Sequence, residues 1–262
     1  VHAENDNFYH ELVKLGQNES IDMIMCIVHS ILPGQFLDSL RKIPSQKPVI
    51  CLKIGNTFTG KRSYFSEHQH SFSQSLFHNI CSQGFALYAD DSFYFLGAVV
   101  TLAKNYHLNL SGNQLAIIST SSTIATMVSD TAESLGLDVP LFTEQTENTL
   151  KKVIPNYLFS GNPLVLKTDT NITAIAHCMK VILSDPMIAA MVLILSQSSF
   201  EQILQINGLV FSDIRKPIFP ILFDLQSDSS LKKESAYNIL STVEQTIYGL
   251  KTLHTFLDYK QK

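Results

Sequence analysis

The sequence lacks paired cysteines, a strong charge excess and long apolar runs. Its four cysteines, Cys26, Cys51, Cys81 and Cys178, are widely spaced and form no C-x-x-C pair. We therefore expect four reduced, mostly buried thiols in a cytosolic protein. Only 16% of the residues are charged, the net charge is -4 and the pI is near 6.1. Such a balance gives no general attraction for nucleic acid or an anionic membrane, so neither is expected as a partner.

No membrane or export segment is recognised. The most apolar run, 187-MIAAMVLIL-195, is too short to span a bilayer, and no signal peptide is evident, so a cytoplasmic location is expected. With 262 residues, 45% of them apolar, the chain is long enough for one large domain or two of ordinary size. The first residue is Val1 rather than methionine, which leads us to expect a piece of a longer protein.

Short apolar runs alternate with amphipathic stretches along the chain, a pattern typical of βα units that form a parallel sheet. The first half predicts strands at 22–28, 48–54 and 85–89 and helices at 34–43, 71–83 and 91–106. The second half predicts strands at 114–119, 189–195 and 217–223 and helices at 121–136, 143–153, 170–184, 198–207 and 235–258.

The polar stretch 107-HLNLSGNQ-114 separates the two halves, and we place the domain boundary there. The prediction is an α/β protein of two doubly wound parallel-sheet domains, 1–110 and 111–262. In such sheets ligands gather at the carboxyl ends of the strands.

A glycine-rich stretch, 55-GNTFTGKR-62, follows the second predicted strand and matches the spacing of a phosphate-binding P-loop up to its lysine. Arg62 stands where serine or threonine should hold magnesium. We therefore expect a polar turn with Lys61 and Arg62 in solvent.

Two histidines, His68 and His70, flank Gln69 in the loop 66-SEHQHS-71, and His78 follows eight residues after His70. In a strand this pair would face one side and could chelate a metal. The surrounding polar residues favour a loop, and no further ligand has a suitable spacing, so no metal is predicted.

The strand-to-helix turn 118-ISTSSTIAT-126 is the third candidate. Free N–H groups and the positive end of a helix could bind an anion there, with Ser121 or Ser122 adding hydroxyl donors. An ordinary helix cap is the alternative, because serine and threonine are preferred capping residues.

Larger stretches resemble a known family. The segments 115–140, 161-GNPLVLKTDTNITAIAHCMKVILSDPMIAAMVLIL-195 and 47-KPVICLKIGNTFTGKRSYFSEH-68 resemble the NDP-forming acyl-CoA synthetases, which include succinyl-CoA synthetase and ADP-forming acetyl-CoA synthetase. The likeness runs through essentially the whole chain. It implies two flavodoxin-like, succinyl-CoA synthetase-like domains, the first of them the phosphohistidine-loop domain.

The resemblance also implies chemistry. In the family a loop histidine is phosphorylated and carries the phosphoryl group between an acyl phosphate and a nucleotide, while helix N-termini and a glutamate steady it. His68 is the candidate phosphohistidine, and Ser121, Ser122 and Thr123 are the candidate anion-binding residues. CoA and ATP/ADP with Mg2+ are the implied cofactors. The implied partners are CoA-binding and ATP-grasp domains or subunits, and a homo-oligomer is a further expectation.

The family's motifs are altered in this chain. Using His68 requires a shift of one residue, because counting from Gly55 places Glu67 at the histidine position. His29 stands where the family has its glutamate, and Ser122 and Thr123 replace two glycines of the anion turn, although Asn162 and Pro163 match. Glycine permits close backbone approach to phosphate. The primary hypothesis is therefore a degenerate module, non-catalytic or regulatory by itself; the alternative is an active phosphohistidine-dependent acyl-CoA ligase module.

Overall fold

The computed structural model describes residues 6–64, 72–108, 110, 112–154, 161–210, 216–225, 239–240 and 242–260. The chain divides into two compact units. The first comprises Val1–Tyr106 and Thr255–Lys262, and the second comprises His107–His254. The independent domains predicted at 1–110 and 111–262 stay a prediction.

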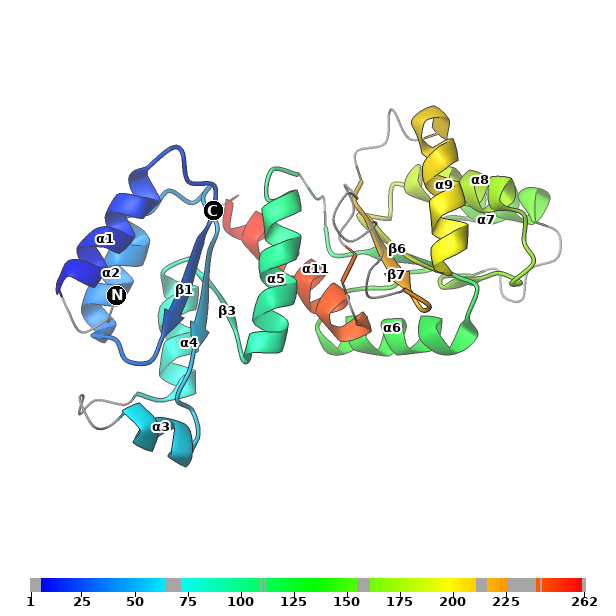
Figure 1. The fold of residues 1–262 in the computed structure, drawn as a ribbon. Coiled ribbons are helices and arrows are strands. Elements are labelled where there is room, and N and C mark those ends of the chain that lie inside the picture. Colours follow the sequence, from blue (N-terminus) through cyan, green and yellow to red (C-terminus); the bar gives the residue numbers. More distant parts are fainter. Residues whose placement is uncertain are drawn as a thin grey trace. The chain divides into compact units, whose positions relative to one another are not determined.

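The first unit contains a parallel three-stranded sheet of β1 (Ile24–Val28), β2 (Val49–Lys53) and β3 (Leu87–Ala89), in the order β1-β2-β3 (Figure 1). The register places Cys26 opposite Cys51 and Val28 opposite Lys53. His29 and Lys53 therefore lie at the same, carboxyl end of the sheet.

Helices cover both faces of this sheet. The helices α1 (Asp6–Gln17), α2 (Pro33–Arg41) and α4 (Gln74–Gln83) supply core residues such as Leu12, Phe36 and Phe77, which share one cluster with Cys26 and Cys51. Because strand side chains alternate between faces, the buried Ile50 and Leu52 point to the other face. There α5 (Ser92–Asn105) packs against β2 and β3. A short helix, α3 (Phe58–Tyr64), follows β2.

The second unit contains a parallel sheet with the strand order β5-β4-β6-β7. Its strands are β4 (Leu115–Ser119), β5 (Leu164–Val165), β6 (Ala190–Leu195) and β7 (Ile218–Leu222). The strand order reverses between β4 and β6, so this is the switch point of a doubly wound sheet, where ligands bind in such folds.

The helices of the second unit are α6 (Ser122–Ser134), α7 (Glu144–Val153), α8 (Ile172–Leu183), α9 (Gln197–Val210) and the first part of α11 (Val243–Lys260). Figure 1 shows α6 on one side of the sheet and α8 on the other. The cluster beneath α7, α8 and α9 includes Ile175, Met179 and Phe200 and is continuous with Ile118 and Met191 of the sheet.

The α/β prediction with two parallel sheets is confirmed, and all four cysteines are buried free thiols as expected. Among the described elements, three were not predicted from the sequence: α1, α3 and the two-residue strand β5. The predicted polar turn at 55–62 is wrong from Phe58 onward, because α3 begins there. The predicted helix 235–258 begins only at Val243 within the described residues. None of the described helices is both long and apolar enough to cross a membrane.

Candidate functional site

The carboxyl end of the first sheet places His29 beside Gly55. Gly55 follows β2 in a left-handed conformation with φ 74°. A side-chain carbon at this position would overlap the His29 ring, so only glycine fits here without displacing that ring. His29 thus lies against the backbone that follows β2.

Lys53, the last residue of β2, is the charged side chain buried at this end of the sheet. It is 2% exposed, and its Nζ donates a hydrogen bond of 2.6 Å to Asn56 Oδ1. Asn56 in turn donates through Nδ2 to the Lys53 carbonyl at 3.1 Å. The Phe72 ring lies 5.0 Å from Nζ. Burial, together with the nearby charge of Lys61, lowers the pKa of Lys53.

The candidate phosphohistidine lies outside the described residues, as does the whole loop 66-SEHQHS-71 with His70. The role of His68 therefore stays a prediction. Of the neighbouring P-loop-like stretch, Arg62 is exposed on α3 and Lys61 is half-buried.

His78, the third of the histidines considered above as metal ligands, is paired with Asp90. Its Nε2 is 3.0 Å from Asp90 Oδ1, and its ring stacks on Tyr88 with a centroid separation of 3.9 Å. Within the described residues, no group of three or more histidine, cysteine or acidic side chains could hold a metal ion.

In the second unit, Ser121 caps α6. Its Oγ accepts a hydrogen bond of 3.4 Å from the Ile124 N–H, and its own N–H donates to Ser119 Oγ at 2.9 Å. The helix cap, which the sequence predicted as the alternative to anion binding at this turn, is therefore present. Ser122 and Thr123 are exposed in the first turn of α6, whose N–H groups have no partners within the helix. Anion binding by this turn stays a prediction.

A second helix, α9, begins at the same end of the sheet, but a carboxylate accepts a hydrogen bond from its first turn. Asp224 Oδ1, just after β7, accepts a hydrogen bond of 2.5 Å from the Gln197 N–H at the start of α9. The first turn of α6 carries no acidic residue. Since a carboxylate competes with an incoming anion for a helix N-terminus, the start of α9 is less suited to an anion than the start of α6.

Asn162 has a structural role. It is 7% exposed, and its Oδ1 accepts from the Ile117 N–H at 2.9 Å. Its Nδ2 donates to the carbonyls of Leu115 at 2.7 Å and Pro140 at 2.9 Å. Both amide N–H groups are therefore used, and Pro163 follows through a cis peptide bond into β5. These contacts hold the segment before β5 against β4.

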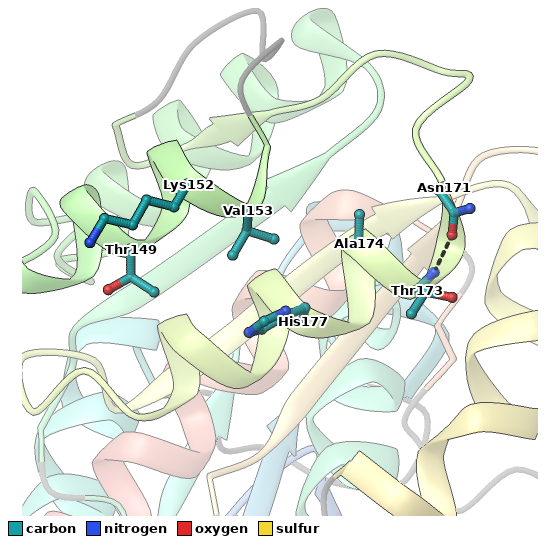
Figure 2. Close-up of a pocket in the computed structure, with 7 residues that line it drawn as sticks. All are labelled: Thr149, Lys152, Val153, Asn171, Thr173, Ala174 and His177. Atoms are coloured by element: carbon teal, nitrogen blue, oxygen red, sulfur yellow. Dashed lines mark hydrogen bonds between the residues drawn. The ribbon is translucent and has the colours of Figure 1, made fainter.

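A groove between α7 and α8 was not anticipated (Figure 2). The groove is open to solvent and has a volume of about 680 Å³. It is lined by Thr149, Lys152 and Val153 of α7, by the α8 cap Asn171, and by Thr173, Ala174 and His177 of α8. The hydrogen bond drawn there, 2.8 Å from the Thr173 N–H to Asn171 Oδ1, caps α8.

Sequence reasoning also missed Lys53 and Asp224. A lysine that ends a wholly apolar strand was the available signal for Lys53. Asp224 and the groove residues gave no signal, because their neighbours lie far away in the sequence.

No family model matches the sequence, and no curated protein matches it. Solved structures do match. The dinucleotide-forming acetyl-coenzyme A synthetase 1 of Ca. Korarchaeum cryptofilum, in complex with phosphate and ADP, gives a TM-score of 0.80 at 17% identity, covering 98% of this chain and 58% of that chain. Its apo form gives 0.79 at 16%, covering 97% and 57%.

The protein PH0766 of Pyrococcus horikoshii gives a TM-score of 0.77 at 16% identity, covering 97% of this chain and 56% of that chain. The present chain therefore spans less than three fifths of each of these proteins. At this level of identity the comparison concerns the fold. Over nearly its whole length, the chain has the fold of part of the acetyl-coenzyme A synthetase 1 chain, in agreement with the fold that the sequence resemblance implied.

Proposed function

We propose that the chain is a two-domain module of an NDP-forming acyl-CoA synthetase-like protein and that the module, by itself, is non-catalytic or regulatory. The observation that carries the proposal is the fold match over 98% of the chain to an acetyl-coenzyme A synthetase. A module of this kind would bind CoA, an acyl-CoA, a nucleotide or phosphate and would act within a larger protein. We expect that protein to be cytoplasmic.

The anion turn supports the non-catalytic part of the proposal. Ser122 and Thr123 occupy positions at which the family has glycines, and their side chains are exposed at the start of α6. Each Cβ keeps a phosphoryl oxygen farther from the backbone N–H groups than glycine would, which weakens the stabilisation of developing charge.

The implied cofactors find few ligands in the described residues. Arg62 replaces the hydroxyl residue that would hold magnesium at the P-loop-like stretch. The described part of the chain offers no cluster of three metal ligands either.

Two measurements on the full-length protein test the proposal. Thermal melting with CoA, acetyl-CoA, ADP, ATP and phosphate should show a shift for at least one ligand, because a ligand that binds only the folded state stabilises it. Incubation with γ-labelled ATP should give no acid-labile phosphate on His68. Labelled phosphate on His68, together with acyl-CoA formation, would overturn the proposal that the module is non-catalytic.

The alternative is an active ligase module with His68 as the phosphoryl carrier. It is favoured by the match to a synthetase in complex with phosphate and ADP. This alternative needs CoA-binding and ATP-grasp domains or subunits. A neutral imidazole is a good nucleophile near neutral pH, so the step is chemically reasonable. His68→Asn should then abolish the label, and His70→Asn, a matched change two residues away, should leave it.

A further inference from the structure

The exposed side of α5 is apolar along almost the whole helix. No residue from Ser92 to Ala103 carries a charge, although Phe93, Leu96, Val100 and Ala103 are all exposed. Leu96 is 57% exposed and Val100 is 36% exposed. A helix on the surface of a globular protein normally presents charged and polar residues to solvent. Single exposed apolar residues are common, but a continuous row of them along one helix indicates a surface that a partner covers.

The spacing of the row is that of a helix–helix contact. Phe93, Leu96, Val100 and Ala103 follow one another at intervals of three, four and three residues, which places them on one side of an α-helix. Apolar residues at these intervals form the contact between helices that pack side by side. At a rise of about 1.5 Å per residue, the row is about 15 Å long. The other side of α5, which includes the buried Phe95, packs against β2 and β3.

The row is complementary to itself when two copies of α5 run antiparallel. Phe93 and Ala103 each lie five residues from Ala98, and Leu96 and Val100 each lie two residues from it. A two-fold axis at the level of Ala98 therefore sets the bulky Phe93 of one copy against the small Ala103 of the other. It sets Leu96 against Val100 in the same way, and each contact occurs twice, as in an isologous interface. A parallel pair would set Phe93 against Phe93 and Ala103 against Ala103.

The charges at the two ends of α5 favour the same antiparallel pairing. Asp91 is exposed at the N-terminal end, where its Oδ1 caps the helix by accepting a hydrogen bond of 2.9 Å from the Tyr94 N–H. Lys104 lies in the last turn, at the C-terminal end. In an antiparallel pair, Lys104 of each copy comes to the end of the helix that carries Asp91 of the other. The two helix dipoles are then also opposed, which is the favourable orientation.

The face of the sheet that carries α5 offers further apolar surface. Met25 and Ile27 pair in register with Ile50 and Leu52, so all four side chains point to that face. Ile50 and Leu52 are buried, whereas Met25 and Ile27, on the edge strand β1, are 58% and 59% exposed. A stable interface buries about 800 Å² on each partner, more than one row of four side chains supplies. Met25 and Ile27 are apolar area on the same face from which an interface can extend.

We propose that α5 forms a homodimer interface, in which the row of Phe93, Leu96, Val100 and Ala103 packs antiparallel against the same row of a second copy of this chain. A second copy is the partner because the row matches itself in side-chain size and its ends match each other in charge. The interface needs no ligand and no phosphoryl transfer, so it goes beyond the proposed function and does not depend on it.

Sedimentation equilibrium of the full-length protein over the micromolar range tests the proposal, and the expected mass is that of two chains. Leu96→Glu introduces a carboxylate at two places in the dimer, because symmetry repeats each change. It should weaken association by about 100-fold or more, since an unpaired charge would be buried. Leu141→Glu is the matched control, because Leu141 is a leucine of the second unit that is 71% exposed. This change should leave the mass unaltered.

Cysteine cross-linking tests the antiparallel arrangement. The four native thiols are buried, so they do not compete for a disulfide at the surface. Mixing Phe93→Cys protein with Ala103→Cys protein under mild oxidation should give mainly the mixed disulfide between the two variants. A parallel arrangement would give the two symmetric disulfides instead.

Circular dichroism establishes that each variant is folded, and if Leu96→Glu is not, the cross-linking result decides the test. Four outcomes would overturn the proposal: a monomer throughout the micromolar range, a dimer that Leu96→Glu leaves intact, equal dissociation by Leu141→Glu, or mainly symmetric disulfides. Neither measurement involves a ligand or phosphorylation, so failure here leaves the melting and labelling tests of the proposed function unaffected.

Discussion

Cys178 shows how one buried group ties stability to pH. Burial raises the pKa of its thiol from 9.0 to about 12. Between these values the unfolded state has lost a proton that the folded state retains. The folded state is then disfavoured by up to about 1.4 kcal/mol for each pH unit above the unfolded pKa.

We therefore expect the free energy of unfolding to fall as pH rises through 9, and to fall less steeply in Cys178→Ala. Urea unfolding at a series of pH values from about 8 to about 10 measures both slopes. The variant loses packing at every pH, so only the difference in slope is diagnostic. Parallel pH profiles for the two proteins would contradict the expectation.

Cys51 differs from Cys178 in having thiol neighbours. Hydrogen bonding of the protonated Cys51 thiol with Cys26 and Cys81, together with burial, raises the pKa of Cys51 well above its ordinary range. The thiolate is the reactive form of cysteine, so the raised pKa keeps Cys51 protonated and unreactive while the protein is folded. The cysteines are part of the core and not of the candidate site.

At the scale of the element, two turns require glycine for different physical reasons. Gly55 and Gly136 both have φ 74°, but only at Gly55 would a side-chain carbon meet another group, the His29 ring. Gly34, within α2, has open space around it. Alanine substitutions at the three positions therefore distinguish the energetic cost of a left-handed backbone from that of steric overlap.

We expect Gly136→Ala to destabilise the protein by about 1 to 2 kcal/mol, the strain of a left-handed residue with a Cβ. Gly55→Ala should lose a further 1 to 3 kcal/mol or so, because His29 must move. Gly34→Ala should be neutral or stabilising by up to about 1 kcal/mol. Urea unfolding gives all three values, and equal effects at Gly55 and Gly136 would show that His29 yields without loss.

At the scale of the whole molecule, α11 is divided between the two units. Ile247 is fully buried in the part assigned to the second unit, and Phe256 is 1% exposed in the part assigned to the first. Two substitutions in one helix can therefore report on two cores.

Phe256→Ala should remove about 3 to 5 kcal/mol and Ile247→Ala about 2 to 5 kcal/mol. Hydrogen exchange followed by mass spectrometry locates each loss. We expect Phe256→Ala to weaken protection in β2 and Ile247→Ala to weaken it in β6. Loss of protection in the same strands for both variants would mean that the units unfold as one.

Much of the fold follows from apolar patterning alone. The run that became β6 is apolar throughout, as a strand buried on both faces requires, and the predicted strand matched it. Element α3 was missed because its seven residues are too few to show a helical apolar period and include Gly60, a poor helix former. Strand β5 was missed because two residues carry no periodicity, and only pairing with β4 makes them a strand.

The candidate site was less predictable. Ser121 was recognised as a cap or an anion ligand, and the structure shows the cap. Nothing in the sequence indicated that Asp224 would meet the start of α9, 27 residues earlier. The packing of His29 against Gly55 likewise depends on strand register, which a single sequence specifies only through the core it buries.

The sequence by itself determined the order of most strands and helices, the burial of the thiols and the α/β class, because apolar periodicity and capping residues act locally. The tertiary structure alone decided which distant polar groups meet: Asp224 with the start of α9, and Asn162 with β4. The physical reason is that electrostatics and hydrogen bonding depend on distance and on the exclusion of water. Both are set when separate segments pack together, not by their spacing along the chain.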